Sequence, residues 1–341
     1  MRPSRWLLFL VALPILLLLL HFHAGPGKGP SQIVSLEPHT KVLKIARMLQ
    51  EKGLIRCPSL FLLLAFLRGH ATRLQAGEYA LTPDLSLSEI LRRLEKGEVV
   101  RYPVTIPEGW TLRQIARHLG SLGLADPERF LRLCHDPKRL RQYQIPSRSL
   151  EGYLFPDTYD LGKGSSEEEI IDRMVGRCFA VFGKFTQPRG LSRHQAITLA
   201  SLIEAETPRE EERRLVSSVF QNRLRLRMPL QCDPTIAYVL SERGREPSRL
   251  SYRDLLVPSP YNTYRHPGLP PGPICNPGAA SLEAALTPAP SSYLYFVSQG
   301  QGSHHFSSTW AEHRRAVQRY RYSRGEKEGR IALEKKANSP Y

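Results

Sequence analysis

Residues 191–207 read LSRHQAITLASLIEAET, and this stretch sets the architecture of the C-terminal half of the chain. Ser192, with Gln195 three positions later, is the pattern of a capping box, in which each side chain covers an amide left unpaired in the first helical turn. The apolar residues that follow recur at spacings of three and four, which predicts a helix with one buried face. Its last turn carries two carboxyl groups, Glu204 and Glu206.

A second helix is predicted directly after the first, because residues 207–210 (TPRE) repeat the capping pattern with proline at its favoured first helical position. The two glutamates therefore stand at a corner between helices. Apolar neighbours raise the pKa of a carboxyl group by disfavouring its charged form, and a general acid that works near neutral pH needs such a pKa. The spacing does not show which of Glu204 and Glu206 would be the general acid. It is also compatible with a structural role, in which both glutamates are surface charges that cap a helix turn.

Long loops follow the two helices. They read MPLQCDP at 228–234, SPYNTY at 259–264 and GLPPGPICNPG at 268–278. These loops combine rigid prolines with aromatic, amide and hydroxyl groups, so we expect ordered binding loops on a helical scaffold, although each residue also fits a plain turn. A hairpin over residues 293–307 and a helix over residues 310–322 are predicted to follow.

The N-terminal half contains an internal repeat. Residues 33–54 (IVSLEPHTKVLKIARMLQEKGL) and 103–124 (PVTIPEGWTLRQIARHLGSLGL) match at the apolar positions of a strand, a turn and a helix. Each copy continues into a second helical stretch and a returning strand. The pattern predicts two βα repeats, over residues 31–98 and 103–185.

The second repeat resembles a LysM module, a small glycan-binding β-α-α-β unit. Residues 104–116 carry the resemblance, with the pattern Val-x-Ile-Pro-Glu-Gly-Trp-Thr-Leu-x-x-Ile-Ala. Any strand-turn-helix needs the same apolar positions, so a purely structural repeat is an equal interpretation. The first repeat has His39 in place of Gly109, so glycan binding is expected of the second copy rather than the first.

The chain begins with a candidate membrane anchor. Arg2 and Arg5 precede an apolar stretch over residues 6–22, which reaches the lower length limit of a spanning helix. The small residues of a signal-peptide cleavage site are missing after it, which favours an uncleaved anchor over a cleaved signal. We expect a cytoplasmic tail at 1–5, a linker at 23–30, and all later residues outside the cytoplasmic membrane, on the periplasmic side.

The composition limits which partners, disulfides and metal sites we expect. The 341 residues carry a formal net charge of +16, which suits nucleic acid, membrane surfaces or the carboxylates of cell-wall peptides. Export and the lack of a recognised motif argue against nucleic acid. Five widely spaced cysteines exclude a dense disulfide framework and favour small buried thiols. The histidines lack metal-ligand spacing, so no metal and no cofactor are expected.

Together these patterns predict an α+β protein. Its parts are an N-terminal transmembrane helix, LysM-like βα repeats and a mainly helical domain with a short β-hairpin. We place this last domain, a candidate for catalysis, at residues 190–323 and a basic tail at residues 324–341.

Several long strings resemble the endolytic murein transglycosylases of the MltG (YceG-like) family, and the resemblance covers nearly the whole chain. The strings are LEGYLFPDTYDL at 150–161, LASLIEAET at 199–207, VFQNRLRLRMPLQCDPT at 219–235, SPYNTYRHPGLPPGPICNPG at 259–278 and YLYFVSQGQGSHHF at 293–306. In the family the first glutamate of the E-x-E-T string is catalytic. The resemblance therefore implies that Glu204, rather than Glu206, is the acid/base residue.

The resemblance implies a peptidoglycan lytic transglycosylase. Such an enzyme cleaves the β-1,4 bond between N-acetylmuramic acid and N-acetylglucosamine and leaves a 1,6-anhydro end, inside glycan strands whose length it limits. Peptidoglycan strands and enzymes of cell-wall synthesis are then the expected partners. Our candidates for holding the sugar are Ser201, Asn222, Gln231, Asp233, Tyr261, Asn262, Tyr264 and His304.

Two alternatives remain at this point. A muramidase would hydrolyse the same bond with water, with Asp233 as its second carboxylate. A non-catalytic scaffold would bind the cell wall through the LysM-like repeats and cleave nothing.

Overall fold

The computed structural model describes residues 20, 23–37, 39–69, 74–186, 190–246 and 248–322. Apart from Leu20, the anchor expected at residues 6–22 lies outside this part of the chain, as does the basic tail at 324–341. Among the described residues, no helix has both the length and the apolar character to cross a membrane.

Contacts divide the chain into two compact units. The first comprises the residues up to Val104 with 120–125 and 159–166, and the second comprises 105–119, 126–158 and 167 onward.

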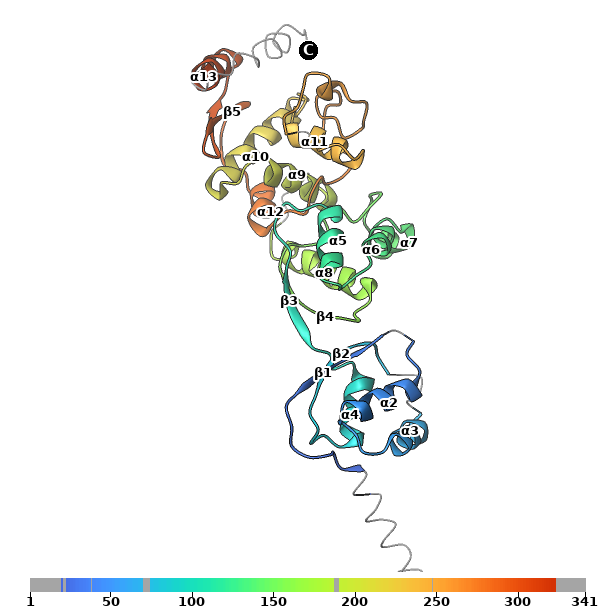
Figure 1. Cartoon of the computed structure of the whole chain (residues 1–341). Coiled ribbons are helices and arrows are strands. Elements are labelled where there is room, and N and C mark those ends of the chain that lie inside the picture. Colours follow the sequence, from blue (N-terminus) through green and yellow to red (C-terminus); the bar gives the residue numbers. More distant parts are fainter. Residues whose placement is uncertain are drawn as a thin grey trace, which may run out of the picture. The chain divides into compact units, whose positions relative to one another are not determined.

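The first unit is built around one small apolar core (Figure 1). Its elements are β1 (Gln32–Leu36), α2 (Val42–Glu51), α3 (Pro58–Leu67), β2 (Gly77–Leu81) and α4 (Leu87–Lys96). β1 pairs antiparallel with β2 and places Val34 opposite Tyr79, and both side chains are fully buried. The predicted strand-helix-helix-strand order of the first repeat is confirmed.

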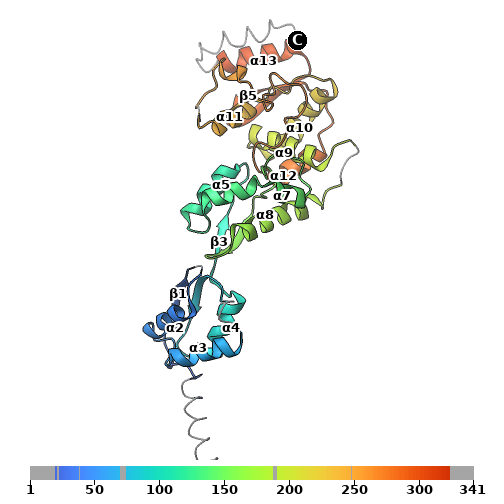
Figure 2. The same ribbon diagram turned by 90° about the vertical axis from the view of Figure 1, so that its right-hand side faces the viewer.

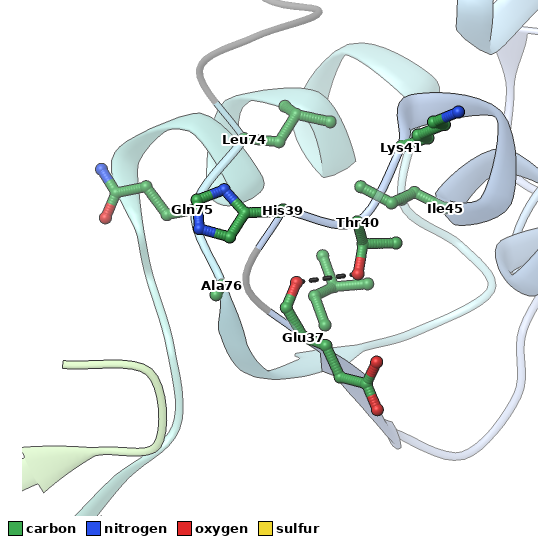
Figure 3. Close-up of a pocket in the computed structure, with 9 residues that line it drawn as sticks. Glu37, His39, Thr40, Lys41, Ile45, Leu74, Gln75 and Ala76 are labelled. Carbon is green, nitrogen blue, oxygen red and sulfur yellow. Dashed lines mark hydrogen bonds between the residues drawn. The ribbon is translucent and has the colours of Figure 1, made fainter. Parts of the chain in front are cut away.

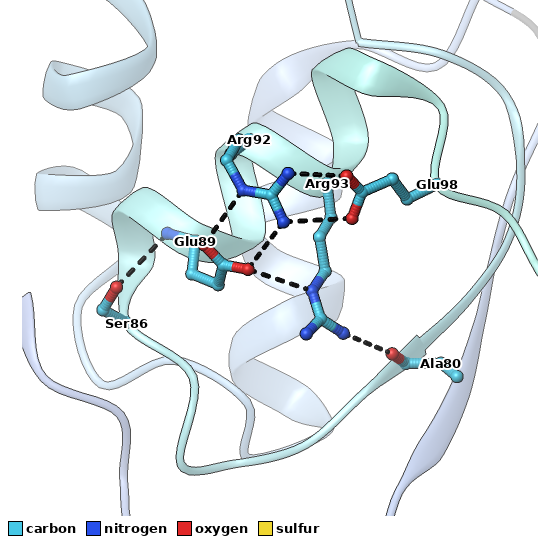
Figure 4. Close-up of polar contacts among 6 residues, drawn as sticks. All are labelled: Ala80, Ser86, Glu89, Arg92, Arg93 and Glu98. Carbon is cyan, nitrogen blue, oxygen red and sulfur yellow. Dashed lines mark hydrogen bonds and ion pairs between the residues drawn. The ribbon is translucent and has the colours of Figure 1, made fainter.

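Helix α4 has both ends fixed by its sequence (Figure 4). The Ser86 hydroxyl accepts the amide of Glu89 at the N-terminus, and Gly97 closes the C-terminus in the left-handed conformation. Arg92 lies between two carboxylates, with Nη2 2.7 Å from Glu89 and Nη1 2.5 Å from Glu98. These ion pairs are exposed, so they orient the helix surface more than they stabilise the unit.

The second repeat follows the same order with one extra helix. It comprises β3 (Arg101–Thr105), α5 (Leu112–Ser121), α6 (Pro127–Cys134), α7 (Pro137–Gln142), β4 (Thr158–Gly162) and α8 (Glu167–Phe182). β3 pairs with β4 in a two-stranded sheet. Three helices thus separate the paired strands, whereas a LysM module has two helices between its strands. The LysM-like assignment stays a prediction.

The two repeats match in detail. Ile45 and Ile115, which the alignment pairs, are both buried in their helices. The turn before each helix contains one residue with a positive φ, 62° at His39 and 76° at Gly109, and these two positions are also paired. The repeat seen in the sequence is therefore a repeat of backbone shape, including a turn conformation that favours glycine.

The helical region is centred on α9 (Arg193–Glu206), which lies against α10 (Glu210–Arg225) and α12 (Ala279–Leu286) (Figure 1, Figure 2). The predicted capping box at Ser192 is confirmed. The capping pattern predicted at residues 207–210 is wrong, because α10 begins only at Glu210 and its N-cap residue, Arg209, makes no side-chain cap hydrogen bond. The expectation of a single buried face is wrong, because residues 196–203 are all buried. Neighbouring elements surround the helix, and its hydroxyl groups bond back to carbonyls of the preceding turn.

The remaining elements complete the second unit. They are α11 (Asp233–Glu242), the short 3-10 helix η1 (Asp254–Leu256), the hairpin of β5 (Tyr295–Gly300) and β6 (Ser303–Ser307), and α13 (Trp310–Tyr322). The predicted hairpin and final helix are confirmed, as is the α+β class.

Truncating the core of the first unit should destabilise it. Ile45 is 2% exposed and Leu43, on the same helix, is 46% exposed. We expect Ile45→Ala to lower the free energy of unfolding of this unit by about 2–5 kcal/mol, because it leaves a cavity. Leu43→Ala is the matched control with a small effect. Chemical denaturation of the full chain measures both, and equal losses would contradict the assigned core.

Candidate active site

Glu204 lies in the last turn of α9, where polar groups of two neighbouring helices surround its carboxyl group. Its side chain is 6% exposed. One carboxylate oxygen, Oε1, accepts a hydrogen bond from Nη2 of Arg213 on α10 at 2.9 Å. The other, Oε2, accepts the backbone N–H of Gly278 at 3.0 Å, at the start of α12. The carboxyl group is thus fixed at both oxygens.

Burial raises the pKa of Glu204 above its usual range. The Gly278 amide and the Arg213 charge oppose this shift, because both favour the ionised form, but burial has the larger effect. A carboxyl group with a raised pKa holds a proton nearer to neutral pH, so Glu204 is suited to donate one.

Two polar atoms beside this carboxyl group lack a hydrogen-bond partner in the described part of the chain. They are Nε of Arg213 and Oγ of Ser281, and both are buried. The Ser281 hydroxyl lies close enough to favour the ionised form of Glu204, although its geometry is not that of an ordinary hydrogen bond. Buried polar groups usually find a partner, so these two atoms are exceptions among the described residues.

A second carboxylate, Glu108, reaches the same guanidinium from the turn before α5. Its Oε2 lies 3.4 Å from Nη2 of Arg213, and its side chain is 47% exposed. Glycine at position 278 permits this approach, because a Cβ atom there would lie 1.9 Å from Oε1 of Glu108. A Cβ atom on Gly109 would make only an ordinary contact, 3.6 Å from Cγ of Glu204.

A buried hydrogen-bond cluster holds the turn and the loop together. Asn276 is fully buried and donates through Nδ2 to the Trp110 carbonyl at 2.8 Å and to Glu151 at 3.1 Å. Its Oδ1 accepts the amide of Leu154 at 2.9 Å. The Glu151 carboxyl also accepts the amide of Leu112, the first residue of α5, at 3.1 Å. The cluster therefore fixes the turn that carries Glu108 relative to the loop that carries Gly278.

The two glutamates that end α9 have different surroundings. Glu206 accepts a hydrogen bond from the thiol of Cys232 at 3.4 Å. Glu204 instead faces Arg213, Gly278 and Glu108. The contacts at the helix corner therefore distinguish Glu204 from Glu206. Helix periodicity alone does not distinguish them.

Three of the expected sugar-holding residues are buried and bonded within the protein. Ser201 donates to the Thr198 carbonyl and accepts the amide of Ile274. Asn222 donates to the carbonyls of Ser291 and Tyr293, and Asn262 donates to those of Leu255 and Val257. These groups hold the loops in place, so any effect on a sugar would be indirect.

The other five expected residues lie on the loops, at the start of α11 (Asp233) and on the hairpin. Gln231 and Asp233 are exposed, and the Tyr264 hydroxyl donates to Asp233. The Tyr261 ring packs on Tyr238, with centroids 5.3 Å apart. His304 is paired with Glu212 of α10 at 2.7 Å. Within the part of the chain that the structure describes, the hydrogen bonds of Glu204 go to Arg213 and Gly278 and to none of the eight candidates.

Sequence reasoning missed Arg213, Glu108, Gly278 and Ser281. Arg213 stands in the run EEERR, which looks like a solvated helix surface, and Glu108 lies in the LysM-like pattern, which predicts a turn there and assigns its side chain no role. The available signal was the Pro-Glu-Gly-Trp turn, where glycine allows a close backbone approach.

The five cysteines are free thiols, and all but Cys57 are buried. Burial raises the pKa of these four thiols. Cys275 donates weakly to the Ser201 carbonyl, with 3.3 Å between sulfur and oxygen. The thiols thus pack and bond as small buried groups, which confirms the expectation from their spacing.

A pocket of about 310 Å³ lies in the first unit, at the turn that repeats the one carrying Glu108 (Figure 3). Its lining includes His39, Lys41 and Gln75, and the Thr40 hydroxyl donates to the Glu37 carbonyl at 2.7 Å. Of its lining residues, Glu37 alone supplies a carboxyl group, and that group is exposed rather than buried like Glu204. This pocket does not reproduce the chemistry of the Glu204 site.

Glu151 should give the protein a distinctive dependence of stability on pH. Burial raises its pKa from 4.5 to about 8, so the folded state keeps a proton that the unfolded chain releases. The free energy of unfolding should therefore fall as pH rises through this window, by up to about 1.4 kcal/mol per pH unit. Glu151→Gln should remove this slope. Denaturation curves from pH 4.5 to 8 test it, and identical slopes in both proteins would refute it.

Comparisons with known proteins agree with one another. The model of the YceG-like family matches residues 34–319. A Bacillus subtilis protein named endolytic murein transglycosylase is 33% identical over 313 residues, which is 86% of each chain. A Streptococcus pneumoniae protein of the same name is 31% identical over 316 residues, covering 83% of this chain and 57% of that protein.

A solved structure also matches. The crystal structure of a YceG-like protein from Listeria monocytogenes is 34% identical, with a TM-score of 0.56, over 85% of this chain and 100% of that one. The family model covers most of the chain, and the fold and the sequence relatives agree with it. This protein therefore belongs to the YceG-like family.

Proposed function

We propose that this protein is a lytic transglycosylase that cuts the glycan strands of peptidoglycan, with Glu204 as its acid/base residue. The observation that carries the proposal is a carboxyl group 6% exposed, held by Arg213 and Gly278, whose pKa burial raises. The relatives named endolytic murein transglycosylase support the substrate class.

The reaction needs one carboxyl group in two protonation states. Protonated Glu204 gives its proton to the bridging oxygen of the β-1,4 bond after N-acetylmuramic acid. Positive charge builds at the anomeric carbon, where the acetamido group of the sugar can stabilise it. Glu204, now a carboxylate, takes the proton of the C6 hydroxyl, which attacks the anomeric carbon and closes the 1,6-anhydro ring.

An internal nucleophile removes the need for a second catalytic carboxylate, in contrast to most glycosidases. It also gains from proximity, provided that the sugar is held in the reactive pose. Gln231, Asp233, Tyr261, Tyr264 and His304 remain our candidates for more distant sugar contacts, and Ser201, Asn222 and Asn262 for supporting the loops.

The setting of the reaction completes the proposal. A membrane anchor at residues 6–22 would hold the catalytic region on the outer side of the cytoplasmic membrane, beside newly made glycan strands and the enzymes that extend them. Glycan binding by the second repeat would keep a strand nearby. Cuts inside the strands would then limit their length.

Replacing the acid/base residue should stop cleavage. We expect Glu204→Gln to lower the rate by about 10²–10⁴-fold, because the amide cannot exchange a proton. Glu206→Gln is the matched control with near wild-type rate, since that carboxyl group faces Cys232 rather than Arg213. Release of soluble fragments from purified strands by the full chain measures both. Loss in Glu206→Gln alone would reject the assignment.

The products distinguish the chemical alternatives. Mass analysis of the fragments should find 1,6-anhydro ends, which are lighter than hydrolysed ends by one water. Reducing ends would instead indicate a muramidase that uses Asp233 or another second carboxylate. Strand binding without fragments, in wild type and Glu204→Gln alike, would indicate a scaffold.

A further inference from the structure

Arg213 is a buried cation that two carboxylates share. Its side chain is 9% exposed. One nitrogen, Nη2, contacts Glu204 at 2.9 Å and Glu108 at 3.4 Å, and Nη1 contacts Glu108 at 3.5 Å. A buried charge without a counter-ion is strongly unfavourable. The guanidinium therefore requires at least one ionised carboxylate at every moment.

In the proposed reaction Glu204 is uncharged for part of each cycle, so it cannot act as the counter-ion of Arg213 throughout. Before each cut Glu204 must be protonated and neutral, and it is ionised only after the proton has left. If Arg213 had no other partner, its charge would hold Glu204 in the ionised form and oppose the first step. Glu108 is 47% exposed, so water solvates its side chain while it contacts Arg213 at 3.4 Å.

We propose that Glu108 is a positioning residue whose carboxylate is the standing counter-ion of Arg213, which leaves Glu204 free to take up and release a proton. The inference rests on the proposed function. Arg213 pairs mainly with Glu108 while Glu204 is neutral and shifts toward Glu204 when that group ionises. Glycine at position 278 leaves room for the Glu108 carboxylate beside Arg213, because a Cβ atom there would lie 1.9 Å from Oε1 of Glu108.

The groups that face Glu204 from each packed element support this role. The Arg213 charge comes from α10, and the Gly278 amide and the Ser281 hydroxyl come from the start of α12; these three favour the ionised form. The Glu108 charge comes from the turn before α5 and favours the neutral form. Among these neighbours, Glu108 alone both repels a charge on Glu204 and pairs with Arg213.

The test is the pH profile of kcat/KM for strand cleavage by the full chain. Glu108→Gln should leave Glu204 as the counter-ion of Arg213, so Glu204 loses its proton at lower pH. We expect the alkaline limb to move down by about one pH unit, with about tenfold lower activity on that limb and the acid plateau retained. Glu108→Asp, which keeps the charge, should restore most of the limb.

A double-mutant cycle separates action through Arg213 from direct repulsion. Arg213→Gln should move the limb to higher pH, and adding Glu108→Gln to it should then change the limb little. Glu283→Gln, which changes an exposed carboxylate on α12, is the matched control and should leave the profile unchanged. Thermal unfolding of every variant checks folding, and Glu108→Asp against Glu108→Gln decides the case if Arg213→Gln does not fold.

Three results would overturn the counter-ion role. They are an unmoved limb in Glu108→Gln, a uniform loss at every pH, and a shift that persists at full size in the Arg213→Gln background. A uniform loss would make Glu108 a group that touches the substrate. A wild-type chain that releases no fragments would instead refute the proposed activity itself.

Discussion

The geometry of the candidate active site depends on the hydrogen bonds of one buried amide, that of Asn276. It joins the loop before α12 to the turn before α5 and to the chain at Leu154, three segments far apart in the sequence. A buried amide must satisfy both its donor and its acceptor groups, so these segments have one arrangement that is favourable. That arrangement brings the Gly278 amide to Glu204 and the Glu108 carboxylate to Arg213.

Burial and charge have opposite effects on the pKa of Glu204. Burial favours the neutral form of Glu204 and the Arg213 charge favours the ionised form; burial has the larger effect, so the pKa of Glu204 is raised. A carboxyl group that must both give and take a proton within one reaction is served by such a balance. The same balance explains why the residues around Glu204 carry charges and amides rather than a purely apolar lining.

The sequence predicted elements that depend on local pattern. The capping box at Ser192, the repeat that pairs Ile45 with Ile115, and the hairpin were all found, because burial periodicity and turn chemistry are local. It did not predict which polar groups meet. Asn262 looked like a ligand but closes a loop, whereas Arg213 looked like a surface charge but lies at the site. Such pairings join residues far apart in the chain, and no spacing rule encodes them.

The buried thiols can report on the movement of two loops near the candidate active site. Cys232 and Cys275 lie in the two loops that flank α9, and burial keeps both protonated and out of contact with solvent. Alkylating reagents react with thiolates, so each sulfur becomes reactive only when its loop detaches from the helix. The labelling rate at either position therefore measures how often that loop opens, without any probe being added to the protein.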